Sequence, residues 1–194
     1  AWLGGGAYTA RYGAAVAAPV LLLGALGTGV LTSPRARTAA IATTVATGLV
    51  SGLLAAGTDR TQAGEVAAAI RARAQPGDVV AYCPDQLGPA VSRGLPASLG
   101  QRTFPAGAAP QFVDWVGYAA RNRAGDPAAF ATDLLARAGP EGTIFLVWAP
   151  GYRTLGRRCD LLEAELAQVR EAETRVARKG DMLERMWLVE FAPG

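Results

Sequence analysis

Two long apolar runs dominate the first third of the chain. Ala14–Leu31 and Ala39–Ala56 each contain 18 residues without a charge, and Thr32–Thr38 separates them. A helix crosses the hydrocarbon core of a bilayer with about 17 to 25 residues, so the runs predict a transmembrane helical hairpin. The separating segment carries Arg35 and Arg37 and no acid. Because short basic loops stay on the cytoplasmic side, we expect the rest of the chain to lie outside the cytoplasm.

A buried helical hairpin of a soluble protein is the alternative, because both runs are rich in Ala, Gly and Thr. Residues 58–194 are too few to enclose two all-round apolar helices and also to form a core of their own. A signal peptide is disfavoured because there are two apolar runs and no basic amino-terminal region. The pattern favours a multi-pass protein of the cell membrane, with a hairpin at 1–57 and an extracytoplasmic domain at 58–194.

After residue 57 the pattern becomes that of a globular domain, in which amphipathic stretches alternate with short apolar runs. The best strand is Thr143–Trp148, which should be central in its sheet. Such alternation predicts a mostly parallel sheet covered on both faces, and hence a small Rossmann-like three-layer α/β fold. The predicted helices are 62–74, 87–93, 112–122, 126–138 and 159–170, and the predicted strands are 78–83, 101–104, 143–148, 171–177 and 184–192.

Charge and composition exclude several classes of function. All 16 acids fall after residue 57 with 16 of the 19 basic residues, so the net charge of +3 belongs to the hairpin. A balanced domain without a basic cluster argues against nucleic acid as a partner. The chain has no histidine, which removes the commonest general base and metal ligand. We therefore expect no metal, no cofactor and no Ser/His/Asp-type hydrolase.

The two cysteines, Cys83 and Cys159, are far apart in the sequence. The predicted sheet brings the end of the strand at 78–83 near the segment that leads from Pro150 to Cys159. A disulfide between them is expected if the domain lies outside the cytoplasm, where disulfides persist. Two unrelated buried thiols are the alternative.

Polar side chains after the predicted strands are the candidates for a binding site, because open α/β sheets bind ligands at that edge. Each has a structural alternative: a cap for Asp85, a core position for Trp115 and a surface ion pair for Arg153. The candidates are Asp85, Gln86, Asp114, Trp115, Tyr152 and Arg153.

Several short motifs of the sequence together resemble those of a known protein family. Tyr8-Thr9-Ala10-Arg11-Tyr12 precedes an apolar run that contains Pro19. Pro76–Tyr82, Val113–Trp115 and Val147–Tyr152 lie in the globular part. With these motifs the sequence resembles the carboxyl-terminal part of GT-C superfamily membrane glycosyltransferases, especially actinobacterial relatives of the protein O-mannosyltransferases.

The resemblance implies transfer of a sugar from a polyprenyl-phosphate donor to an extracytoplasmic glycan or protein acceptor, in contact with membrane lipid. In that family the catalytic acid lies in an early outer loop that this chain lacks, so no catalytic residue is assigned and the chain alone should be inactive. Arg11 and Tyr12 match a position where a guanidinium could meet the donor phosphate, and an interfacial arginine on ordinary lipid headgroups is the alternative. The other function class is a membrane-anchored, non-enzymatic α/β binding module of the cell envelope.

Overall fold

The computed structural model describes residues 10–57, 59–150, 152–180 and 182–194, without the side chains of residues 10–16. The chain divides into two compact units, at Ala1–Thr58 and Asp59–Gly194. The first unit consists of helices α1 (Ala10–Val30) and α2 (Pro34–Ala56). The boundary expected from the sequence lies one position earlier, between residues 57 and 58.

Helix α2 is the one described helix that is both long and apolar enough to cross a membrane. Its 23 residues rise about 35 Å, and no residue of it is buried. The described apolar part of α1, Ala17–Val30, is shorter than a crossing requires. One of the two expected spans is thus supported, and the hairpin as a whole stays a prediction.

The predicted loop at Thr32–Thr38 is mostly wrong, because α2 begins at Pro34. The Ser33 side chain accepts a hydrogen bond from the backbone of Ala36, and Pro34 occupies the first helical position, where its missing N–H costs nothing. Arg35 and Arg37 accordingly lie in the first turn of α2.

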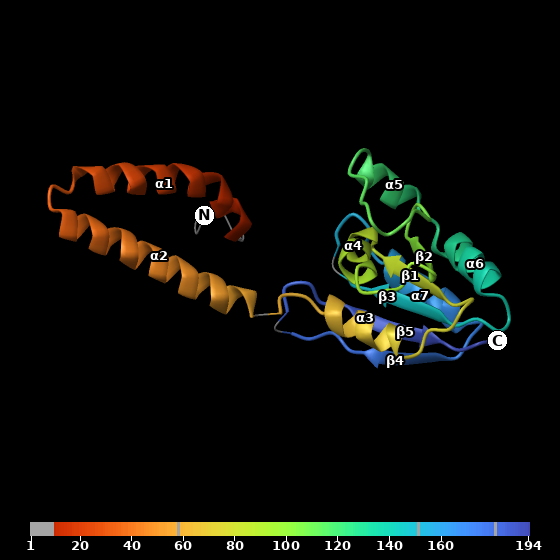
Figure 1. The fold of residues 1–194 in the computed structure, drawn as a ribbon. Coiled ribbons are helices and arrows are strands. Elements are labelled where there is room, and N and C mark those ends of the chain that lie inside the picture. Colours follow the sequence, from red (N-terminus) through yellow and green to blue (C-terminus); the bar gives the residue numbers. More distant parts are fainter. Residues whose placement is uncertain (1–9, 58, 151, 181) are drawn as a thin grey trace. The chain divides into compact units, whose positions relative to one another are not determined.

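The second unit is a five-stranded sheet with helices on both faces, in the strand order β2-β1-β3-β5-β4 (Figure 1). The strands are β1 (Val79–Cys83), β2 (Gly100–Thr103), β3 (Ile144–Trp148), β4 (Ala172–Val176) and β5 (Trp187–Phe191). The helices are α3 (Ala63–Arg71), η2 (Asp85–Leu87), α4 (Gly88–Ser92), α5 (Tyr118–Ala124), α6 (Pro127–Ala138) and α7 (Arg158–Ala167).

Strands β1, β2 and β3 are parallel, whereas β5 is antiparallel to both β3 and β4. The central place of β3 is confirmed, and the expectation of a mostly parallel sheet is corrected to a mixed one. The segment that joins β4 and β5 is too short for a crossover helix, so the chain turns back as a hairpin. Strand β4 lies at the edge, as expected, and β5 lies inside the sheet.

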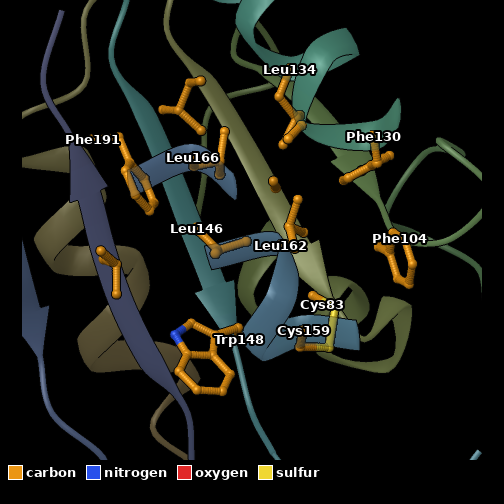
Figure 2. Packing of buried hydrophobic residues seen from close by; sticks show 14 of the residues in the cluster. Cys83, Phe104, Phe130, Leu134, Leu146, Trp148, Cys159, Leu162, Leu166 and Phe191 are labelled. Carbon is orange, nitrogen blue, oxygen red and sulfur yellow. A yellow bond between two sulfur atoms is a disulfide. The ribbon is translucent and has the colours of Figure 1, made fainter. Parts of the chain in front are cut away.

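Alternate residues of the buried strands face two separate hydrophobic clusters. Ala81 and Leu146 pack with α6 and α7 in one cluster, which Figure 2 shows around Leu134, Leu162 and Phe191. Tyr82 and Val147 face the other cluster with α3 and α4. Burial on both faces explains the continuous apolar runs of β1 and β3.

Cys83, the last residue of β1, forms a disulfide with Cys159 in the first turn of α7. The bond lies within the hydrophobic cluster of Figure 2. It confirms the predicted pairing and joins two segments separated by 76 positions in the sequence.

Helix α5 begins later than the predicted helix at 112–122. The Asp114 side chain accepts a hydrogen bond from the backbone N–H of Val116, which makes a turn in place of a helix. Gly117 has φ +63°, a conformation that glycine adopts readily. The helix therefore starts at Tyr118, and residues 112–117 form an exposed loop.

Candidate functional site

The carboxyl ends of β1 and β3 form the natural binding edge of the domain. The two strands are parallel neighbours, but α4, which follows β1, packs on one face and α7, which follows β3, packs on the other. Helices that leave neighbouring strands toward opposite faces open a crevice at the strand ends. The segments after β1 and β3 carry Asp85 and Tyr152, two of the predicted site residues.

Asp85 and Gln86 lie together, as expected, and both contact a residue that the sequence did not single out. The Tyr118 hydroxyl donates a 2.7 Å hydrogen bond to the Asp85 carboxyl and accepts a 3.1 Å bond from the Gln86 amide. Burial raises the pKa of Asp85, although the Tyr118 bond opposes the shift. Burial and then Asp85 raise the pKa of Tyr118 to about 12. Asp85 is thus no helix cap but the buried member of a partly buried hydrogen-bonded pair.

A pocket of about 280 Å³ opens beside this pair, and we call it the aromatic–carboxylate pocket. It is lined by Asp85, Phe112, Asp114, Arg121 and small residues of the loop after β2. Arg121 forms a 2.6 Å ion pair with Asp114 and also donates to the backbone oxygens of Asp114 and Val116. These bonds fix the loop at 112–117 against α5, so the pocket wall is preorganised.

Large apolar side chains are left exposed along this loop. Phe112 is 81% exposed and Trp115 63%, and the Trp115 ring lies 5.1 Å from that of Tyr118. Trp115 is therefore not a core residue. Grouped exposed aromatic side chains rimmed by charged groups mark binding surfaces on soluble domains.

A second hollow, also of about 280 Å³, lies at the end of β3, and we call it the arginine pocket. Its lining includes Tyr152, Arg178, Leu183, Glu184 and Arg185. Burial raises the pKa of Tyr152, and the charges of Glu184 and Asp85 raise it further. Burial also raises the pKa of Glu184. Tyr152 thus lines the arginine pocket, within the electrostatic reach of Glu184 and Asp85.

Of the remaining predicted residues, Arg153 lines neither pocket. Arg153 is exposed and forms no ion pair with the carboxylates that the structure describes. Arg11 and Tyr12 fall in the first turns of α1, but their side chains lie outside the described residues. Among the described residues, no three His, Cys, Asp or Glu side chains converge as a metal site.

Sequence reasoning missed Phe112, Tyr118 and Arg121. Arg121 gave no signal, because in the predicted helix seven residues rise about 10.5 Å, which would keep Arg121 away from Asp114. Phe112 and Tyr118 were hidden, since an aromatic residue in an apolar stretch is more often part of a core than part of a site.

Comparisons with protein-family models, curated proteins and solved structures find no match to this chain.

Proposed function

We propose that the chain is the carboxyl-terminal part of an integral membrane glycosyltransferase that moves a sugar from a polyprenyl-phosphate donor to an extracytoplasmic acceptor. In this proposal, the globular domain binds the glycan of the acceptor. The observation that carries the proposal is the aromatic–carboxylate pocket, in a domain that directly follows a helix of bilayer length. The resemblance at Arg11-Tyr12 supplies the donor class.

The proposed topology has α1 and α2 both crossing the membrane. Arg35 and Arg37, at the start of α2, would then stay on the cytoplasmic side, which puts the end of α2 and the domain outside. The Cys83–Cys159 disulfide supports export, because disulfides persist in oxidising compartments.

On the donor side, Arg11 and Tyr12 are proposed to contact the phosphate of the polyprenyl donor at the outer end of α1. An arginine suits this role because its planar guanidinium holds two phosphate oxygens at once. The catalytic acid would come from a part of the enzyme outside the 194 residues.

On the acceptor side, the pocket offers the two kinds of contact that a sugar ring needs. The apolar C–H face of a pyranose packs on an aromatic ring, which Phe112 offers in the pocket lining and Trp115 offers on the same exposed loop. Sugar hydroxyls donate to carboxylates, and Asp114 and Asp85 supply these acceptors at the same pocket. Arg121 would donate hydrogen bonds to the ring or hydroxyl oxygens of the sugar through guanidinium N–H groups that do not face Asp114.

The donor half is tested by photo-crosslinking of a diazirine-bearing polyprenyl phosphate to the chain in native membranes. Arg11→Ala should reduce labelling about tenfold, because a charge-assisted hydrogen bond is worth about 1.5 to 3 kcal/mol. Arg37→Ala is the matched control, since it removes the same charge at the other proposed face. Equal labelling by polyprenol without the phosphate would defeat the donor assignment.

A non-enzymatic envelope protein remains the second candidate, because the same pocket would serve a membrane-anchored glycan-binding module. Glycan binding that depends on Trp115, combined with no crosslinking to the polyprenyl phosphate, would favour that function over the transferase.

A further inference from the structure

One buried side chain fixes the segment that joins β4 to β5. Gln62 is 1% exposed, and its amide nitrogen donates a 2.8 Å hydrogen bond to the Ala177 oxygen. Its amide oxygen accepts bonds from the backbone N–H groups of Lys179, at 2.9 Å, and Met186, at 3.2 Å. The backbone at both ends of the segment is thus bonded to the same residue.

Two guanidinium groups of this segment, those of Arg178 and Arg185, line the arginine pocket. Arg178 lies over the Trp187 ring, 4.9 Å from its centroid, and Arg185 donates a 3.0 Å bond to the Met182 carbonyl. Neither arginine is within ion-pair distance of a carboxylate in the described part of the chain. Both contacts orient the cations but leave their charge available to an anion.

The net charge of the residues that line the arginine pocket indicates which kind of anion the pocket would bind. Among the described lining residues Glu184 is the one acid, so with Arg178 and Arg185 these residues carry a net charge of +1 when Glu184 is ionised. That charge matches a phosphate diester, which carries a single negative charge. The Tyr152 hydroxyl adds a neutral hydrogen-bond donor to the same wall.

The place of the pocket in the chain favours a lipid as the source of the phosphate. The backbone N–H of Leu183 donates a 2.9 Å bond to the Arg60 oxygen, and Arg60 follows the end of α2 by four residues. Four residues span at most about 14 Å, so a membrane-crossing α2 would keep Arg60 close to the bilayer surface. Leu183, in the pocket lining, is 83% exposed, as suits a side chain that enters the lipid interface.

We propose that the arginine pocket binds the phosphate diester of a membrane phospholipid headgroup through Arg178, Arg185 and Tyr152, with Leu183 inserted between lipids. The proposal goes beyond sugar transfer, and it rests on one part of the proposed function, the crossing of the membrane by α2. Bound in this way, the domain is held at the membrane surface in one orientation.

Native mass spectrometry of the full 194-residue chain, purified in detergent, tests the proposal. The probes are phosphatidylglycerol, diacylglycerol with the same acyl chains but no phosphate, and inorganic phosphate. The Arg178→Gln/Arg185→Gln double variant should bind phosphatidylglycerol at least about tenfold more weakly, because two charge-assisted contacts are lost. Arg93→Gln/Arg123→Gln is the matched control, since it removes two exposed arginines elsewhere on the domain.

Selective loss of phosphatidylglycerol in the pocket variant, with diacylglycerol binding unchanged, supports the proposal. An equal loss in the control variant, or no loss in either, overturns it. Inorganic phosphate that binds as tightly as phosphatidylglycerol overturns the lipid assignment. Crosslinking of the polyprenyl donor at Arg11 is measured separately, so failure of the lipid pocket and failure of the transferase proposal give different results.

Discussion

Replacing Gln62 by leucine gives the sharpest test of how the β4–β5 segment is held. Leucine keeps most of the side-chain volume but removes all three hydrogen bonds to Ala177, Lys179 and Met186. Ala177 and Lys179 are exposed, so water can replace their lost partner, whereas Met186 is fully buried.

The magnitude follows from this difference. An unsatisfied buried N–H at Met186 costs about 1 to 3 kcal/mol, and each bond replaced by water costs about 0.5 to 1 kcal/mol. We therefore expect Gln62→Leu to lower the free energy of unfolding by about 2 to 5 kcal/mol. The Arg178–Trp187 stack should also loosen, because the segment loses its attachment at both ends.

Urea unfolding of the full chain in detergent, followed by tryptophan fluorescence, measures the change. Gln168→Leu is the control: Gln168 is exposed, and surface substitutions usually change stability by less than about 0.5 kcal/mol. Hydrogen exchange at the Met186 amide should be faster in Gln62→Leu. Equal stability of the two variants would refute the role given to Gln62.

Three further predictions concern the disulfide, the buried acid and the exposed aromatic. Cys83→Ala should destabilise the domain by about 4 kcal/mol on the chain-entropy account of a loop this long, and reducing agent should lower the urea midpoint of the wild type but not of the variant. Because burial raises the pKa of Asp85 above 3.8, the folded state binds the proton more tightly than the unfolded state. The stabilisation from protonation of Asp85 is complete below pH 3.8 and is lost as the pH rises through the folded-state pKa. Asp85→Asn should therefore flatten the pH dependence of the free energy of unfolding in this acidic window. An unchanged pH profile would contradict the buried position of the acid. Trp115→Ala should weaken binding of the acceptor glycan about tenfold in isothermal titration while leaving the urea midpoint unchanged, because the ring is mostly exposed; Val116→Ala is its control, and an equal loss of binding in both would argue against stacking.

The sequence predicted the layers of the domain well, because its signals are local. Continuous apolar runs at Val79–Cys83 and Ile144–Trp148 indicate strands buried on both faces, and the structure has both. Asp126 caps α6 through bonds to Ala128 and Ala129, which explains why that helix was placed nearly correctly.

The errors arose where a side chain competes with the backbone or where pairing is non-local. The turn at Asp114 breaks the predicted helix, and apolar periodicity carries no sign of it. The direction of β5 is set by its pairing with β3 and β4, which strand composition does not encode.

The candidate site was predicted in part. Asp85 and Gln86 could be singled out because a strand exit is a topological position that the sequence reveals. Their partner Tyr118 lies 33 positions from Asp85, so only the folded chain brings them together. Arg153 also follows a strand, yet it lines neither pocket. The end of a strand determines where the following loop begins, but it does not determine where the side chains of that loop point.

Transfer of a labelled sugar most directly tests whether this chain belongs to a membrane glycosyltransferase. Membranes from cells that carry the gene for this chain, and from cells in which it is deleted, are given polyprenyl-phosphate donors loaded with each candidate sugar in turn. We expect one labelled sugar to enter extracytoplasmic glycan or protein only when the gene is present, with transfer restored by the wild-type gene and strongly reduced with Arg11→Ala. Equal incorporation of every sugar with and without the gene would contradict the transferase function.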